Sequence, residues 1–207
     1  ETSIERLAIE NAVLIIDRFV HVSGGFSLTR QADVPVQLTN STSPVMMDAL
    51  AFGAGNVDIF IGSGPYVEDT TGEGDIDYND VRNPDAAGLV VENANFGLVT
   101  MRPSDNSPGK YTGLSATADF VGFVGIEDFK LSATDIVVEY NAASGSANDN
   151  VVVNFGATPY LIPTGNGEIS ISHPTKLLRA SVTNAELQIS DYAFMEGSLA
   201  FEKGPTE

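Results

Sequence analysis

The sequence predicts an all-β fold, in the form of an elongated tandem β-repeat of the sandwich or solenoid kind with little or no helix. Three observations predict it. Short runs rich in Val, Ile, Phe and Tyr recur along the chain, turn-forming segments separate these runs, and parts of the sequence repeat. Many short strands with frequent turns are typical of a sandwich or a solenoid, and tandem units favour an elongated shape.

The strand candidates are runs in which apolar and polar residues alternate, as they do when one face of a strand is buried. The clearest of them are 26–29, 57–61, 135–140 and 168–172. Segments rich in Gly, Ser, Asn and Pro lie between such runs and read as turns. One segment, 43–50, is the best candidate for a short helix, and no segment shows a sustained helical period.

The strongest repeat relates the two ends of the chain. Residues 7–30 align without gaps with residues 180–203, at an offset of 173. The pair Asn11 and Ala12 falls on Asn184 and Ala185, and the apolar positions are kept better than the identities. Conserved apolar spacing of this kind indicates that the two segments bury the same face.

A weaker copy lies between these two segments. Residues 91–94 echo 9–12, 129–131 echo 26–28, 135–138 echo 33–36, and 151–160 echo 57–66. We therefore divide the chain into a first β-repeat (1–86), a second β-repeat (87–173) and the start of a third (174–207). Because the chain stops within a repeat and does not begin with Met, we expect it to be a processed piece of a longer polypeptide.

The charge balance excludes several partners. The chain of 207 residues has 28 acidic and 10 basic residues, which gives a formal net charge of -18. This excess of acids argues against nucleic acid and anionic membrane surfaces as partners. No apolar run approaches the roughly 18 residues of a membrane-spanning helix, so we expect no membrane insertion.

The residue types also argue against an enzyme. Cysteine is absent, which removes thiol catalysis, disulfides and thiolate metal sites. The chain has only two histidines, His21 and His173, so a metal site with several His ligands is excluded within one chain. Carboxylates remain as the only abundant chemical groups.

The sharpest motif is a twelve-residue loop from Asp69 to Asp80, with acids at positions 1, 5, 7, 9 and 12. Calcium takes about six to eight oxygen ligands, and a loop of this length can wrap enough of them around one ion. Gly74 stands at position 6, where the chain must turn sharply, and Ile76 at position 8 is expected to anchor the loop to a core. The predicted calcium ligands are the side chains of Asp69, Thr71, Glu73, Asp77 and Asp80 and the carbonyl of Asp75.

This loop resembles an EF-hand loop, and it is closer to the dockerin-type variant, which ends in Asp rather than Glu. It departs from the pattern at Thr71, where Asp or Asn is usual, and at Glu73, which is long for its position. The alternatives are a solvated acidic turn and a glycosidase pair made of Asp77 and Asp80. The chain has seven acids and one arginine between positions 67 and 85. Without a counter-ion the seven carboxylates would repel one another, which favours calcium.

The second repeat contains a sister of this loop at 164–170. Gly165, Gly167 and Ile169 match Gly72, Gly74 and Ile76, but most of the carboxylates are gone. The sequence therefore indicates that the loop shape is structural and that the acids at 69–80 are an addition to it.

Four other residues have ordinary structural interpretations. His21 aligns with Phe194 on an alternating stretch, so we expect a core or half-buried histidine. His173 precedes Pro174 at a repeat boundary and is expected to be exposed. Tyr66 and Tyr160 both follow Pro at equivalent strand ends, and we expect them to pack on a repeat edge, with sugar stacking as the alternative.

Three segments carry a family resemblance: 64–77 (GPYVEDTTGEGDID), 90–98 (VVENANFGL) and 115–136 (SATADFVGFVGIEDFKLSATDI). They resemble a repeat found in very large secreted bacterial proteins, which often also carry hemolysin-type calcium-binding arrays. The resemblance covers most of the chain and implies tandem repetition and a location at the cell surface or in the extracellular matrix. It supplies no catalytic residues.

These observations lead to a functional expectation. We expect an extracellular, bacterial surface module that is structural or adhesive, is stabilised by Ca²⁺, and assembles head-to-tail into a fibre with copies of the same repeat or chain. The segment 174–207 or 1–34 would complete a neighbouring unit by adding strands at an open edge. The alternative is a carbohydrate-binding module that stacks glycans on Tyr66, Tyr78 or Tyr160.

Overall fold

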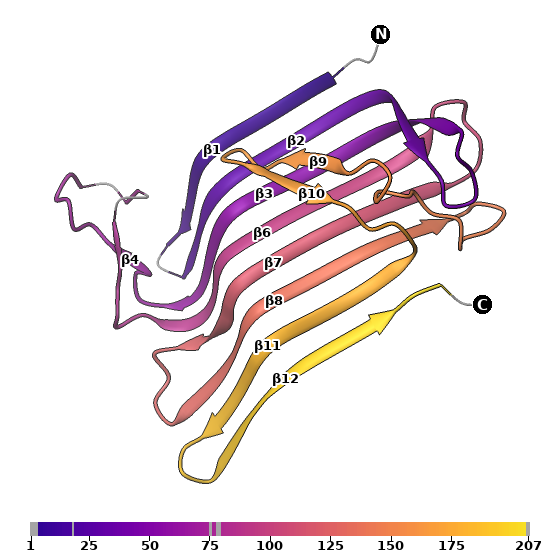
Figure 1. Cartoon of the computed structure of the whole chain (residues 1–207). Coiled ribbons are helices and arrows are strands. Elements are labelled where there is room, and N and C mark those ends of the chain that lie inside the picture. Colours follow the sequence, from indigo (N-terminus) through magenta and orange to yellow (C-terminus); the bar gives the residue numbers. More distant parts are fainter. Residues whose placement is uncertain (1–3, 18, 75, 78–79, 206–207) are drawn as a thin grey trace.

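A computed structural model describes residues 4–17, 19–74, 76–77 and 80–205 of the chain. The described residues form strands and connecting loops and contain no helix. None of them therefore belongs to a helix long and apolar enough to cross a membrane. The all-β prediction is confirmed. The architecture is one large open antiparallel sheet with two small ribbons, rather than a solenoid or a closed barrel (Figure 1).

The large sheet contains eight strands in the order β1-β2-β3-β6-β7-β8-β11-β12, and each strand is antiparallel to its neighbours. Strands adjacent in this order follow one another along the chain. The two ribbons, β4-β5 and β9-β10, interrupt that succession. The strands are β1 (Ile4–Ile16), β2 (Val20–Gln37), β3 (Pro44–Ser63), β4 (Val67–Glu68), β5 (Val81–Arg82), β6 (Ala87–Pro103), β7 (Lys110–Val124), β8 (Phe129–Ser144), β9 (Tyr160–Pro163), β10 (Glu168–Ile171), β11 (Leu177–Ile189) and β12 (Ala193–Lys203).

The helix expected at 43–50 is wrong, because this segment lies in β3 and pairs with β2 and β6. Met47 and Ala49 are buried, whereas Met46, Asp48 and Leu50 between and beside them are exposed. This alternation has the period of a strand, and pairing on both sides overrides the local helix propensity of Met, Ala and Leu.

The two segments of the strong sequence repeat form hairpins at opposite edges of the sheet. Each residue pair of the β11-β12 ladder corresponds to a pair of the β1-β2 ladder at the offset of 173. Both hairpins have a register shift at the same place, between Ile9 and Ala12 in one and between Val182 and Ala185 in the other. Their turns match as well, since Asp17 and Ser190 both have positive φ.

A line of irregular backbone crosses the sheet at the level of these shifts. Asn56 in β3, Asn93 in β6 and Asp135 in β8 have φ near +50°, a region that Asn and Asp tolerate better than most residues. A β-bulge bends its strand and increases the twist. Figure 1 shows that the long strands bend together toward the end that carries β4. The recurring Asn-Ala pair at positions 11, 93 and 184 lies on this line.

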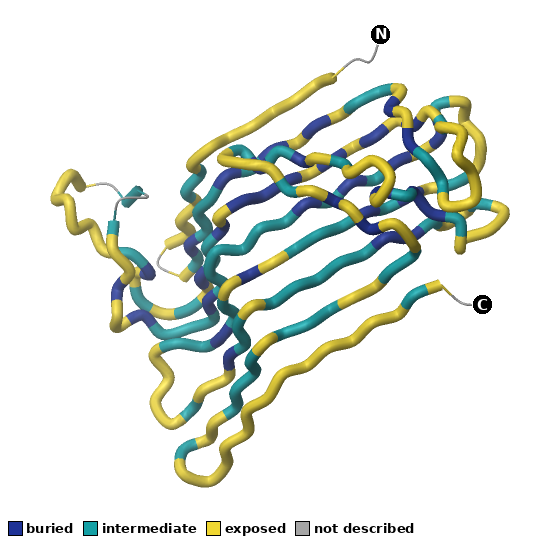
Figure 2. The backbone as a smooth tube through the Cα atoms, in the orientation of Figure 1, coloured by how far each residue is buried: buried dark blue, intermediate teal, exposed yellow. Residues whose placement is uncertain are grey.

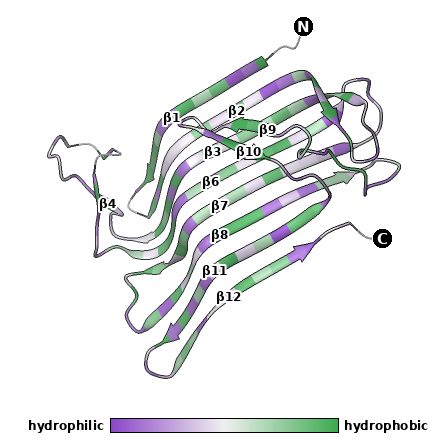
Figure 3. Cartoon of the chain, viewed as in Figure 1, coloured by the Kyte–Doolittle hydropathy of each residue, from purple (hydrophilic) through white to green (hydrophobic). Residues whose placement is uncertain are grey.

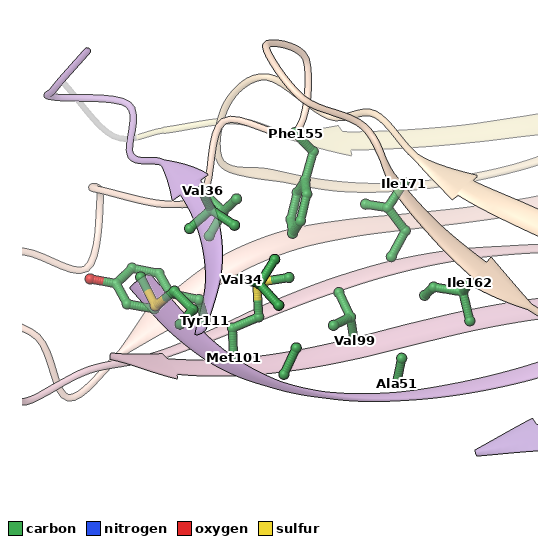
Figure 4. Close-up of a cluster of buried hydrophobic side chains, with 12 residues drawn as sticks. Val34, Val36, Ala51, Val99, Met101, Tyr111, Phe155, Ile162 and Ile171 are labelled. Atoms are coloured by element: carbon green, nitrogen blue, oxygen red, sulfur yellow. The ribbon is translucent and has the colours of Figure 1, made fainter. Parts of the chain in front are cut away.

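The main core lies between one face of the sheet and the segment that contains β9 and β10. Phe155, Ile162 and Ile171 come from that segment and point toward Ala51 and Val99 on the strands (Figure 4). The approach is close: a Cβ at Gly53 would lie 1.9 Å from the carbonyl oxygen of Pro163. Glycine in β3 therefore allows β9 to pack directly on the sheet.

His173 is buried, and the expectation of an exposed linker histidine is wrong. Its Nε2 lies 3.2 Å from the carbonyl oxygen of Leu114, and its Nδ1 lies 3.8 Å from the carboxylate of Glu139. The neighbouring Asn141 is fully buried, and its amide group donates to the carbonyl oxygens of Val153, His173 and Thr175. These contacts hold the segment that follows β10 on β7 and β8. The residues next to His173 in the sequence give no sign of these contacts.

Candidate functional site

The acidic loop is the turn between β4 and β5, at the end of a segment that leaves the sheet after β3. The carboxylate of Asp69 accepts hydrogen bonds from the backbone N–H groups of Gly72 (2.6 Å) and Gly74 (2.7 Å) and from the hydroxyl of Thr71 (3.2 Å). The hydrogen bonds from Gly74 and Gly72 lower the pKa of Asp69 below its ordinary value. Asp69 therefore caps the first half of the loop.

Asp80 has the same role at the other end. One carboxylate oxygen accepts from the backbone N–H of Thr70 (3.0 Å), and the other accepts from the N–H of Asp77 (2.9 Å). Gly72 and Gly74 have φ of +76° and +92°, so the sharp turn expected at Gly74 is confirmed. The loop is closed by its own acids at both ends.

The predicted ligands are distributed around this turn. Thr71 and Glu73 are exposed, Asp77 and Asp80 are half-buried, and Asp75 lies outside the described residues. Within the described part of the chain, no three side chains of Asp, Glu or His lie close enough together to hold a metal ion. Calcium ligation is thus a proposal, and it requires Asp69 and Asp80 to share carboxylate oxygens between backbone N–H groups and the ion.

The loop stands on a small aromatic cluster that fixes it to the bent end of the sheet. The ring of Tyr66 stacks on that of Phe60, with centroids 4.7 Å apart, and lies 5.4 Å from the ring of His21. The guanidinium carbon of Arg82 lies 5.3 Å from the Tyr66 centroid, and Arg82 also pairs with Glu92 at 2.6 Å. The interpretations of His21 and Tyr66 as packing residues are confirmed, because both are buried.

Two cavities lie between this loop segment and the sheet, and His21, Tyr66 and Val67 line both. One, of about 440 Å³, is mostly apolar and includes Ile76, the predicted anchor of the loop. The other, of about 330 Å³, includes Asp77, Asp80 and Arg82. Burial lowers the pKa of His21 and raises the pKa of Tyr66 to about 12, so both side chains are neutral near pH 7.

This geometry weighs against the alternatives that the sequence left open. Asp77 and Asp80 belong to one short turn, in which the backbone of the first donates to the carboxylate of the second, rather than facing each other across a cleft. Tyr66 packs against Phe60 and Arg82, and Tyr160 is half-buried against the main core, so neither presents an open ring to a sugar. Tyr78 lies outside the described residues.

The role of Arg82 in this site was not predicted from the sequence. Its guanidinium connects Tyr66 of the loop segment to Glu92 of β6. The signal was present, because Arg82 is the one basic residue among the seven acids between positions 67 and 85. A lone cation in an acidic segment is expected to have a carboxylate partner.

The chain matches no protein-family model, no curated protein and no solved structure.

Proposed function

We propose that the chain is a structural module of an extended extracellular β-sheet, stabilised by calcium at the β4-β5 loop, and that it has no catalytic role. The observation that carries this proposal is the match between the hairpins β1-β2 and β11-β12. They have the same register, the same bulge and the same turn, and they lie at opposite edges of one sheet. The sheet therefore has a first strand of the series at one edge and a second strand at the other, and both edges are open to a further strand.

The order of the strands supports a repeating unit of three strands. The strands β1, β2 and β3 are followed by an insertion, then β6, β7 and β8 are followed by another, and β11 and β12 begin the series again. This succession supports the division into 1–86, 87–173 and 174–207. The units share one sheet, because β3 pairs with β6 and β8 pairs with β11 across the two boundaries.

The charge supports the proposed setting. A net charge of -18 keeps the surface repulsive toward nucleic acid and anionic lipid, and calcium would neutralise part of it. The loop at 69–80 concentrates acids on a segment that projects from the sheet, where an ion from the surrounding medium can reach it (Figure 1). Calcium bound there would stiffen the projecting segment.

The proposal is tested with a protein in which two copies of the chain are joined in tandem. Repeat proteins gain stability from each interface between neighbouring units. We expect the tandem protein to melt in one transition, at a temperature higher than that of the single chain by roughly 4 °C, which corresponds to about 1–2 kcal/mol in a domain of this size. Circular dichroism and calorimetry measure both quantities.

A matched control is the tandem protein with Leu7→Lys and Ile9→Lys in its second copy only. Both side chains are exposed in the single chain, so the substitutions spare its fold and weaken only the new interface. The gain in melting temperature should disappear. If the tandem protein melts at the temperature of the single chain, or in two independent transitions, the proposal of a continuous repeat is wrong.

A further inference from the structure

The two edge strands of the large sheet are long and uncovered. β1 has 13 residues and β12 has 11, and each has one hydrogen-bonded neighbour among the described strands. The strands β9 and β10 contact β2, β3, β6 and β7 and neither edge strand, and the turn between them approaches the backbone of β1 at Ile9. Figure 2 shows β12 exposed along its whole length and β1 along most of it. Exposed edges of this length are a template for pairing with another chain.

Both edges are apolar as well as open. The exposed side chains include Leu7 and Ile9 on β1 and Leu199 and Phe201 on β12. Figure 3 shows hydrophobic residues along both strands. Natural proteins protect an edge strand with charges, proline or a covering segment. Neither described edge strand contains proline, and the apolar residues outnumber the charged ones on both. This composition favours edges that pair with another strand.

The directions of the two edges suit one another. The eight strands are joined by antiparallel pairings only, so β1 and β12 run in opposite directions. A second copy in the same orientation, placed beside β12, brings its β1 antiparallel to that strand. The antiparallel alternation of the sheet then continues through the junction without a break.

The bulges fix a register for this junction. In β1 the two residues after Ile9 stand opposite one residue of β2, and in the other hairpin two residues of β11 stand opposite Ser198 of β12. When the two irregular positions are placed at the same level, Ile9 lies opposite Leu199 and Leu7 lies opposite Phe201. Residues directly opposite each other in an antiparallel pair lie on the same face, and apolar pairs of this kind stabilise a sheet.

The same register matches charges. Continuing from Leu7 and Phe201, it places Arg6 opposite Glu202 and Glu5 opposite Lys203. Within the described chain, neither Arg6 nor Lys203 takes part in an ion pair. A register shifted by two residues would instead set Lys203 against Leu7. Opposite charges stabilise a cross-strand pair, whereas a lysine opposite a leucine does not, so the first register is favoured.

We propose that the β12 edge binds a second copy of this chain through its β1, antiparallel and with Leu7 opposite Phe201. The contact is heterologous, so it joins copies head to tail and leaves a free β1 and a free β12 at the two ends of the assembly. This inference rests on the proposed structural function and adds to it the partner, the two strands and the register.

Cysteine cross-linking reads the register directly, because the chain contains no cysteine of its own. A Leu7→Cys protein is mixed with a Phe201→Cys protein that differs in mass, and the mixture is oxidised mildly. Directly opposite Cβ atoms lie about 4.5–5.5 Å apart, whereas diagonal ones lie about 7–8 Å apart. A disulfide requires about 3.5–4.5 Å, so the matched pair should cross-link at least several times faster than a mixture of Ile9→Cys and Phe201→Cys.

The side chains of Leu7 and Phe201 are 65% and 55% exposed, so the substitutions leave the fold intact, which circular dichroism verifies. Three outcomes would overturn the inference: equal rates for the matched and shifted mixtures, homodimers of either variant formed as fast as the mixed dimer, and no cross-link at any concentration. A gain in melting temperature of the tandem protein together with any of these would sustain the proposed function and reject only this junction.

A charge exchange gives an independent readout by analytical ultracentrifugation. Lys203→Glu places two acids opposite each other and should weaken association by about 2–5-fold, and adding Glu5→Lys in the same chain should restore it. Glu5 also lies 3.8 Å from Arg30, so the Glu5→Lys protein alone serves as the control for that contact. Association that is unchanged in all three variants would contradict the register.

Discussion

The two insertions of this chain occupy equivalent places in the order of strands but differ in how they contact the large sheet. The β4-β5 insertion (64–86) follows the third strand of the first unit, and the β9-β10 insertion (145–176) follows the third strand of the second. The second one lies along the sheet and supplies buried side chains to the main core. The first contributes Tyr66 and Ala86 to a small cluster, with Val67 packed against it, and projects away from the sheet (Figure 2).

This difference explains why only one of the two loops is acidic. A Cβ at Gly165 would lie 2.2 Å from the carbonyl oxygen of Ile9, and Thr164 is buried, so the sister turn is pressed against the backbone of the sheet. Carboxylates in that position would be desolvated without a partner, at a cost of several kcal/mol. At Gly72 and Gly74, in contrast, a Cβ would meet open space. Charge is retained where the insertion leaves the sheet.

The largest expected effect is that of a core substitution in the insertion that packs on the sheet. Phe155 is 1% exposed, and Phe155→Ala leaves a cavity under the β9-β10 insertion that should cost about 3–5 kcal/mol of unfolding free energy. Leu161→Ala, in the same insertion but at an exposed position, is the control and should cost less than about 1 kcal/mol. Urea denaturation followed by circular dichroism measures both, and equal costs would contradict the assignment of the main core.

The next effect concerns the projecting insertion alone. Tyr66→Ala removes the ring that stacks on Phe60 and carries Arg82, and should cost roughly 1.5–3 kcal/mol of local stability. Because few other contacts hold this segment, we expect faster hydrogen exchange and proteolysis within 64–86 and little change in the β9-β10 insertion. Tyr66→Phe keeps the ring and should behave as the unaltered chain. Uniform destabilisation of both insertions would show that they are not independent.

The strands and the edge hairpins could be predicted from the sequence, because their signals are local. The runs 26–29, 57–61 and 135–140 lie in β2, β3 and β8, the run 168–172 contains β10, and the repeated segments form matching hairpins. The echo between 57–66 and 151–160 has no such counterpart, since Val57 lies in β3 whereas 151–159 forms no strand of the large sheet. This segment lies beside the end of β2 instead, with a bridge from Val153 to Leu38 and a hydrogen bond from Asn154 to Gln37.

What the sequence could not show is which distant segments meet. The burial of His173 depends on Leu114 and Glu139, which lie far from it in sequence. The single open sheet depends likewise on the pairing of β3 with β6 and of β8 with β11, across the boundaries at which separate repeats were expected. For the candidate site, the loop and its glycine turn could be predicted, but the cluster of His21, Tyr66 and Arg82 beneath it could not.

A pH titration tests the same contrast between the two insertions, because His21 lies beside Tyr66 of the β4-β5 insertion. Burial lowers the pKa of His21 in the folded chain, so the unfolded or locally open state binds a proton first as the pH falls. The contribution of His21 is fully present above its unfolded pKa of about 6.5, and it is lost as the pH falls from there toward the lowered folded value. We expect the protection factors for hydrogen exchange in the β4-β5 insertion, which are corrected for the intrinsic exchange rate at each pH, to fall over this window.

The control for this titration is His21→Phe, which installs the residue found at the equivalent position of the other edge hairpin, Phe194. It keeps an aromatic ring beside Tyr66 and removes the titrating group. The fall in protection below about pH 6.5 should then vanish. A fall of the same size in the variant would assign the pH dependence to other groups.

The smallest expected effect is that of calcium on the projecting loop. With a dissociation constant of ~1 mM, as in weak extracellular sites, 1 mM Ca²⁺ stabilises the chain by about 0.4 kcal/mol and 10 mM by about 1.4 kcal/mol. The melting temperature should therefore rise by a few degrees with Ca²⁺ but not with an equal concentration of Mg²⁺. The rise should be absent in the Asp69→Ala/Asp77→Ala variant. An unchanged melting curve of the original chain would refute the calcium proposal.

The central claim is that this sheet continues into further copies through its two edges, and hydrogen exchange of the edge strands tests it most directly. We expect amides of β1 and β12 to become protected as protein concentration rises, while those of β2, β3, β6, β7, β8 and β11 are protected at every concentration. In the Leu7→Lys/Ile9→Lys chain, the edge amides should stay unprotected throughout. Edge amides that exchange at the same fast rate from dilute to concentrated protein would show that the sheet does not continue through its edges.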